Sequence, residues 1–235
     1  MVGFGDSMQL AVGLILSGDA DLWAIVLLSL RVSLTAVLLA AIVGMPLGAL
    51  LAVSRFRGRS TLIVLVNALM GLPPVVVGLS VYLMLSASGP LGVFSLLYTP
   101  SAMIIAQFVL VTPIITALSR QVVEELHVEY SDYLRSMRVT GIRAVPTLLW
   151  DGRFGLATAL LAGMGRAIAE VGAVMIVGGN INHVTRVMTT TIALETSKGD
   201  LGMALALGVI LIVLAISVNA LITGLTQLSA RYAHA

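Results

Sequence analysis

Two charged side chains stand alone in a long apolar stretch of this sequence. Between Phe154 and Ile181, only Arg166 and Glu170 carry a formal charge. About 20 consecutive apolar residues cross the hydrocarbon of a bilayer, so a membrane span is predicted here. An isolated charge at the bilayer centre costs at least about 2.5–3.5 kcal/mol, so such residues usually face protein or water. Residues four apart share one face of a helix. We therefore expect a polar stripe on an apolar helix inside a bundle.

The sequence carries no set of residues typical of an enzyme active site. It has no Gly-x-Ser-x-Gly turn, no His-Glu-x-x-His and no Gly-x-x-x-x-Gly-Lys-Ser/Thr loop for nucleotide phosphates. His127, His183 and His234 fall in separate segments, which disfavours a metal site, and the absence of cysteine excludes disulfides and thiolate ligands. We expect no catalytic residue, metal or cofactor in this chain. Any energy that it uses must come from a partner or from a gradient.

The composition places the whole chain in the membrane. Of its 235 residues, 59% are hydrophobic and 10% are charged, and the mean hydropathy is +1.07. A soluble domain carries about 25% charged residues. The net charge of +2 is no nucleic-acid signal, because the arginines lie in short loops. The prediction is a single all-α integral membrane domain over residues 1–235.

Five apolar stretches are long enough to span a bilayer, at residues 22–53, 61–85, 100–118, 154–178 and 201–225. The apolar run before them is too short, so residues 1–20 are expected to form a short interfacial or packed helix. The first span is over-long, which predicts tilt or a bend near Pro46. Arg31 lies early in that span, within snorkelling reach of an interface.

The second span is interrupted by Pro73 and Pro74. Proline removes a backbone donor and frees carbonyl groups, which is tolerated at membrane depth only where protein or a water-lined path satisfies them. Two interpretations remain open: a kink that serves packing, or a break beside a pathway.

The distribution of Lys and Arg predicts the orientation. Nine arginines fall on one side, at positions 55, 57, 59, 120, 135, 138, 143, 153 and 231, whereas only Arg186 and Lys198 fall on the other. Basic loops stay in the cytoplasm, so five spans place the N-terminus outside and the C-terminus inside. The odd number of spans argues against the two inverted halves of many secondary transporters.

The polar segment 119–153 is the natural place for a cytoplasmic partner to bind. Acidic residues up to Asp132 precede Arg135 and Arg138, which predicts a surface helix over 130–141 with Gly141 as its C-cap. A solvated helix without a partner is the alternative.

Three stretches resemble the permease subunits of bacterial ABC importers for oxyanions, of the tungstate and molybdate type. The first is the helix expected to end at Gly141, similar to the permease loop that reads Glu-Ala-Ala-x-x-x-Gly, although this chain has Arg135-Ser136-Met137 in place of Glu-Ala-Ala. The second is Gly165-Arg166-Ala167-Ile168-Ala169-Glu170-Val171-Gly172-Ala173, close to the Gly-Arg-x-Ile-x-Glu-x-Gly-Ala run of oxyanion permeases. The third is residues 188–200, which look most like the tungstate type.

The resemblance implies a type I permease fold and an assembly. Two permease copies would line one pathway as a homodimer in the inner membrane. Two ATPase subunits, which bind ATP and Mg²⁺, would grip the cytoplasmic segment 119–153 through Asp132, Arg135, Arg138 and Gly141. An external binding protein would deliver the anion.

The same resemblance gives roles to the remaining candidate residues. Arg166 would favour the anion, Glu170 would tune it or bridge helices, and the pathway or gate would also include Asn180, Pro73 and Pro74. Asn182, Thr189, Thr190 and Thr191 would lie at the outer mouth. The alternatives are an internal ion pair for Arg166 and Glu170, and ordinary loop solvation for the outer residues.

The expected function is therefore import of an oxyanion, tungstate first, with molybdate or sulfate as the alternative. A stand-alone anion channel or gradient-driven carrier belongs to a different class. Such a protein would also lack a nucleotide loop, but it would not need the long charged cytoplasmic segment.

Overall fold

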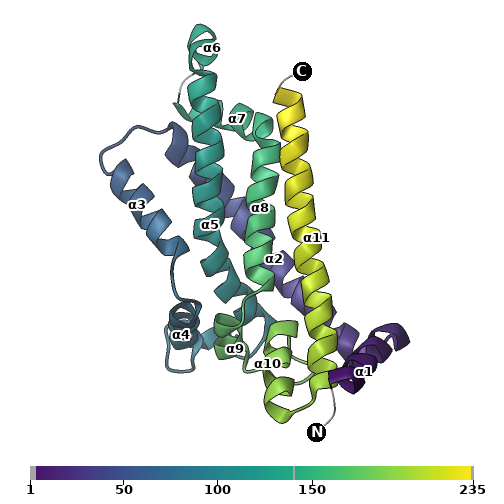
Figure 1. Ribbon diagram of the computed structural model, residues 1–235. Coiled ribbons are helices and arrows are strands. Elements are labelled where there is room, and N and C mark those ends of the chain that lie inside the picture. The colour runs from purple at the N-terminus through teal and green to yellow at the C-terminus, as the bar shows by residue number, and fades with distance from the viewer. Residues whose placement is uncertain (1–3, 140, 234–235) are drawn as a thin grey trace. The chain divides into compact units, whose positions relative to one another are not determined.

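Every regular element in the described part of the chain is helical. The computed structural model describes residues 4–139 and 141–233, and within these ranges the side chains from Gly5 to Gly224 (Figure 1). The predicted all-α fold is confirmed. In chain order the elements are α1 (Phe4–Ser17), α2 (Ala20–Val53), α3 (Arg59–Met70), α4 (Pro74–Leu85), the 3₁₀ helix η1 (Gly92–Phe94), α5 (Pro100–Glu129), α6 (Ser131–Ser136), the 3₁₀ helix η2 (Gly141–Ala144), α7 (Val145–Asp151), α8 (Arg153–Ile168), α9 (Gly172–Gly178), α10 (Met188–Lys198) and α11 (Leu201–Ala233).

Among the described residues, three single helices are long and apolar enough to cross a membrane: α2, α5 and α11. Two helix pairs pass the same test only together. The pair α3–α4 is bent by 99° and the pair α8–α9 by 59°, so up to five crossings result if each pair is one span. The first break falls at the prolines: Pro73 precedes α4 and Pro74 is its first residue, where a missing N–H costs nothing.

The contacts divide the chain into two compact units. One comprises residues 1–36, 73–107 and 167–217, and the other comprises residues 37–72, 108–166 and 218–235. The long helices α2, α5 and α11 each contribute a segment to both. The Arg166–Ala167 bond is one of the boundaries between them.

In the first unit, α4 and α9 lie against each other (Figure 1). Their backbones approach so closely that a Cβ on Gly78 would lie 2.7 Å from Cα of Ala173. A separate buried cluster joins α1, α2, α10 and α11 through residues that include Ala11, Leu22 and Leu207. The backbone N–H of Met188 donates to Oγ of Ser29 at 2.8 Å, which fixes the start of α10 against α2.

In the second unit, α2 and α5 pack through glycine. A Cβ on Gly48 would lie 2.5 Å from the carbonyl oxygen of Thr116 and 2.8 Å from the backbone nitrogen of Arg120. Both neighbours are backbone atoms, which cannot move aside without shifting a helix.

We expect Gly48→Ala to destabilise the protein by roughly 1–3 kcal/mol, because it overpacks this contact. The melting temperature of the purified complex should fall accordingly. Gly208→Ala is the matched control: it also adds a methyl group within a helix, but at a site with nothing within 4 Å. Equal melting temperatures for the two variants would contradict the close contact.

The helix α5 is longer than the sequence predicts. The third span was expected at 100–118 with a loop from residue 119, but the helix continues to Glu129. Ser119 and Val123 are fully buried, and Arg120 pairs with Glu124 one turn later. Buried residues and an i,i+4 ion pair stabilise a helix whether or not lipid surrounds it, so the polar composition did not mark its end.

Candidate functional site

The stretch that holds Arg166 and Glu170 is not one helix. Helix α8 ends at Ile168 and α9 begins at Gly172, so the predicted continuous helix over 154–178 is wrong. The reason is local: Oε1 of Glu170 accepts the backbone N–H of Ala173 at 3.1 Å. This bond satisfies a donor that the first turn of α9 cannot satisfy itself. The carboxylate thereby starts a new helix instead of continuing the old one.

The break places the two charged residues in different local structures. Arg166 lies in the last turn of α8, where a cation interacts favourably with the helix dipole. Glu170 lies between the helices, and its side chain is 3% exposed. The expected i,i+4 stacking on one helical face is therefore wrong as well.

Glu170 borders a small polar cavity in the first unit. Five polar residues line it, each at least nine-tenths buried: Ser29, Ser33, Gln107, Glu170 and Thr189. Its volume is about 10 Å³, and a single water needs about 10–15 Å³. Nε2 of Gln107 donates to the carbonyl of Ala167 at 3.0 Å, whereas Oε1 has no protein partner within the described ranges. This is a polar centre inside an apolar bundle.

The sequence reasoning missed Gln107, Ser29 and Ser33. One signal was available, because Gln107 carries the only amide side chain in the predicted span 100–118. A polar side chain in a membrane span costs free energy unless it is hydrogen-bonded, so it usually marks an interior position.

Replacing Glu170 should separate its capping role from its charge. Glu170→Ala removes the acceptor for the N–H of Ala173, and an unsatisfied buried donor costs about 1–3 kcal/mol. Glu170→Gln retains an acceptor oxygen in the same place. We expect the alanine variant to lower the melting temperature of the purified protein clearly more than the glutamine variant. Equal losses would show that the charge, rather than the cap, holds this break.

The three threonines expected at the outer mouth are turned inward. Thr189, Thr190 and Thr191 are at most 8% exposed. Oγ1 of Thr189 donates to the carbonyl of Glu170 at 2.8 Å, and Oγ1 of Thr191 donates to that of Val187 at 2.7 Å. That these hydroxyls meet a ligand at the outer mouth stays a prediction, and in the structure they bond to the chain itself. Thr189 fastens the first turn of α10 to the α8–α9 break, whereas Thr191 bonds to the N-cap residue of α10 itself.

Asn180 has a structural role in this conformation. Its backbone is left-handed, with φ of 50°, which asparagine tolerates better than most residues. Oδ1 of Asn180 lies 2.9 Å from Oγ1 of Thr190, and its Nδ2 donates to the carbonyl of Thr190 at 3.4 Å. Asn182, in contrast, is exposed and lines a cavity together with Arg31 and Arg186.

The helix expected over 130–141 ends five residues early. Helix α6 stops at Ser136, and Gly141 begins η2 instead of ending α6. The N–H of Val139 donates to the carbonyl of Leu134 at 2.9 Å, and that of Arg138 to Arg135 at 3.0 Å. With Arg138 at φ of 56°, these bonds form the Schellman motif that closes a helix. Arginine here occupies the left-handed position that glycine usually takes.

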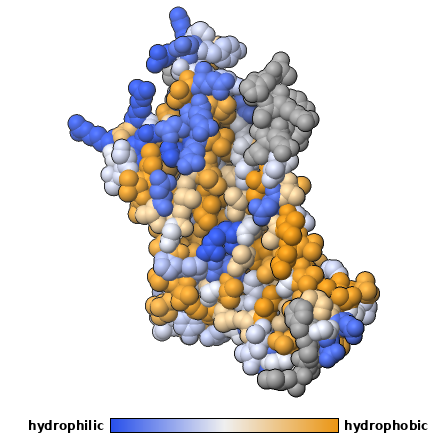
Figure 2. Space-filling view, viewed as in Figure 1, coloured by the Kyte–Doolittle hydropathy of each residue, from blue (hydrophilic) through white to orange (hydrophobic). Residues whose placement is uncertain are grey.

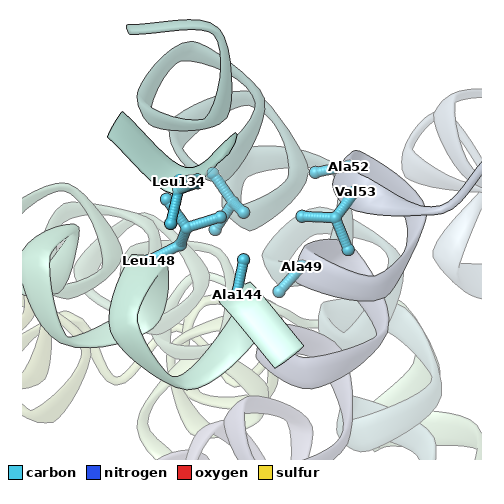
Figure 3. Packing of buried hydrophobic residues seen from close by; sticks show 7 residues of the cluster. Ala49, Ala52, Val53, Leu134, Ala144 and Leu148 are labelled. Atoms are coloured by element: carbon cyan, nitrogen blue, oxygen red, sulfur yellow. The ribbon is translucent and has the colours of Figure 1, made fainter. Parts of the chain in front are cut away.

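Asp132, Arg135 and Arg138 are all exposed on and after α6. Beneath them, a buried cluster joins this segment to the long helices (Figure 3). Leu134 of α6 and Leu148 of α7 lie close to Val53 at the end of α2, and Val123 of α5 belongs to the same cluster. A displacement of α6 would therefore be felt directly by α2 and α5, because packed interiors transmit strain.

An ion-pair network reinforces the same region. Glu124 of α5 pairs with Arg59 at 2.8 Å and also with Arg120. Nε of Arg59 donates to the carbonyl of Leu51 at 2.8 Å, which satisfies an acceptor at the end of α2. In the sequence, Arg59 is one of several arginines in a short loop. Nothing there distinguishes it, so its contacts with Leu51 and Glu124 could not be predicted.

Between the end of α2 and α6 lies a hollow of about 710 Å³. Its charged or titratable lining residues are Arg55, His127 and Arg135, and no carboxylate of the described residues lines it. Figure 2 shows hydrophilic surface gathered at this end of α5 and around α6. This basic hollow suits an acidic partner surface.

The chain was compared with known proteins. Residues 44–229 match the family described as binding-protein-dependent transport system inner membrane component. A "Probable anion ABC transporter permease protein" of Haloferax volcanii is 42% identical over 87% of this chain and 91% of its own length. The "Tungstate uptake system permease protein TupB" of Peptoclostridium acidaminophilum is 39% identical over 94% of this chain and 97% of its own. That of Campylobacter jejuni is 38% identical over 70% and 69%.

These similarities confirm the resemblance drawn from the sequence motifs, and they extend over most of the chain. This multi-pass membrane protein therefore belongs to the family of inner membrane components of binding-protein-dependent transport systems.

Proposed function

We propose that this chain is the permease subunit of an ABC importer whose cargo is tungstate. The observation that carries the proposal is 39% identity to a tungstate uptake permease over 94% of the chain. A dianion cannot cross hydrocarbon unaided, because desolvating it would cost tens of kcal/mol. The chain would supply the pathway, and other subunits would supply the energy.

The proposed assembly is a homodimer of this chain with two ATPase subunits and an external binding protein. The ATPases bind ATP and Mg²⁺, and the permease has no nucleotide site of its own. Membership in a binding-protein-dependent family supports the external partner. The excess of arginine at positions 55–59 and 120–153 supports a cytoplasmic location for α6, with the N-terminus outside.

The broken spans support a pathway role for the residues near them. Helices interrupted at membrane depth are tolerated where protein or water satisfies the freed backbone groups, and transport sites often use such breaks. Both broken pairs meet in the packing of α4 against α9. We assign Arg166 and Glu170, with Pro73 and Pro74, to the region that opens and closes the pathway.

The proposed coupling site is α6 with the turn that follows it. Asp132, Arg135 and Arg138 present charges to the ATPase, and Gly141 allows the left-handed backbone, with φ of 58°, from which η2 begins. A push on α6 would reach α2 and α5 through Leu134 and Leu148. Nucleotide-driven motion would thereby change the arrangement of the spans.

Molybdate or sulfate is the alternative cargo, because both are tetrahedral dianions with the same charge. A stand-alone channel or gradient-driven carrier is the alternative of a different class. The hollow beside α6 and the buried link beneath it favour the ATPase-driven importer, since a carrier has no need of either.

Reconstitution tests the proposal. The chain should be co-purified with its ATPase, placed in liposomes and supplied with the delivery protein and tungstate. We expect uptake that strictly requires ATP and the delivery protein, with tungstate favoured over molybdate and sulfate. Steady anion flux through the chain alone would overturn the importer. ATP-dependent uptake of a different oxyanion would overturn only the cargo.

A further inference from the structure

One cavity in the first unit gathers cationic side chains that the sequence left in unrelated segments. It has a volume of about 260 Å³ and is bordered by α2, by the start of α5 and by the loop before α10. Its polar lining residues are Asp21, Arg31, Asn182, His183 and Arg186. The cavity is far larger than the roughly 10–15 Å³ that a single water needs.

The wall contributed by α2 is one face of that helix. Asp21, Ala24, Ile25, Leu28 and Arg31 line the cavity, and spacings of three and four residues place side chains on a single stripe. Ten residues separate Asp21 from Arg31, which is about 15 Å along a helix axis. The cavity therefore runs along α2 from an exposed carboxylate at one end to a guanidinium at the other.

Within the described part of the chain, Arg31 and Arg186 both lack a counter-ion. Among the described residues, neither Arg31 nor Arg186 forms an ion pair with a carboxylate. Nε of Arg186 is buried with no hydrogen-bond partner there. The only carboxylate in the lining, that of Asp21, is 71% exposed and lies 3.9 Å from Nδ1 of His183. Arg31 is exposed, whereas Arg186 is partly buried. A partly buried guanidinium with an unsatisfied donor is costly, so the site around Arg186 is incomplete without an anion.

The geometry points to a binding site for a tetrahedral oxyanion between Arg31 and Arg186, with Asn182 as a neutral donor. Guanidinium groups bind oxyanions through two parallel N–H donors, which suits this ligand class. This inference rests on the proposed function, because that function places residues 182–186 on the outer side, where cargo arrives. The ligand is the cargo oxyanion or the phosphate of a lipid headgroup, which share the same chemistry.

Direct binding decides whether the site exists. The complex with its ATPase should be placed in nanodiscs of zwitterionic lipid and dialysed against tungstate, with bound tungsten measured by mass spectrometry. We expect Arg31→Gln and Arg186→Gln each to weaken binding at least about tenfold, as the loss of a charged hydrogen bond predicts. Arg31→Lys and Arg186→Lys keep the positive charge and should therefore retain part of the tungstate binding that the glutamine variants lose. Wild-type binding by both glutamine variants would overturn the site.

Lys198→Gln is the matched control. This variant also removes a cation from the first unit. However, Lys198 already pairs with Glu195 at 3.0 Å and does not line this cavity. We expect it to bind tungstate like the wild type. A loss equal to that of the arginine variants would show a general charge effect and overturn the assignment.

Two further arms separate the possible ligands and the possible failures. If nanodiscs with anionic lipid suppress tungstate binding in the wild type, and phosphate co-purifies with it but not with Arg31→Gln, the headgroup occupies the same two-arginine site. If the reconstituted importer moves no tungstate, the proposed cargo fails, and dialysis against molybdate, sulfate and phosphate still tests the site. Binding of none of these anions would overturn it. The site would also be overturned if Arg31→Gln and Arg186→Gln weaken only the docking of the delivery protein and leave anion binding intact.

Discussion

Replacing Arg166 by alanine is expected to abolish tungstate uptake while the complex remains assembled in the membrane. Arg166 lies 13 residues beyond Arg153, the first residue of α8, which is about 20 Å along the helix axis. That distance exceeds half of the roughly 30 Å hydrocarbon core. A cation at such a depth lowers the electrostatic cost of a dianion in the pathway, and nothing in alanine replaces it.

The control for this experiment lies on the same helix. Arg153→Ala removes the same charge at the other end of α8, where the guanidinium is exposed and lies over the rings of Trp150 and Phe154. We expect it to keep most of the uptake. Arg166→Lys retains the charge but loses the planar fork of donors, so it should retain a fraction. Normal uptake by Arg166→Ala would exclude a pathway role, and failure of the complex to assemble would indicate an internal packing role instead.

Reversing the charges of Arg135 and Arg138 together is expected to uncouple ATP hydrolysis from transport. Both side chains are exposed beside α6, and reversal turns attraction toward an acidic partner into repulsion. The amount of tungstate imported per ATP hydrolysed in proteoliposomes should fall to near zero, while hydrolysis by the ATPases continues. An unchanged ratio would contradict the assignment of α6 as the coupling site.

The backbone at Arg138 requires its own control. Arg138 adopts a left-handed conformation, which costs a residue other than glycine roughly 1–2 kcal/mol. Arg138→Gly therefore removes the charge while relieving the backbone, and the Schellman turn should persist. If the double reversal acts through charge, Arg138→Gly should keep a stable protein with only a partial loss of coupling. Complete uncoupling by the glycine variant would show that its side chain alone makes the essential contact.

The sequence by itself determined the class of the molecule. Partition into a bilayer depends on the composition of each 20-residue stretch, so hydropathy alone indicated an all-helical membrane protein. The motif from Gly165 to Ala173 indicated the family. The prolines at 73 and 74 marked a real break, because the missing N–H of proline acts within its own turn.

Only the tertiary structure decided where charges and breaks lie relative to their neighbours. The carboxylate of Glu170 starts α9 because it accepts the N–H of Ala173, and the turn at Arg138 ends α6 before Gly141. Ser29 meets the backbone of Met188 from 159 positions away, and Arg31 lines one cavity with Arg186. Hydropathy describes the affinity of each segment for lipid, whereas these contacts depend on which distant segments pack together.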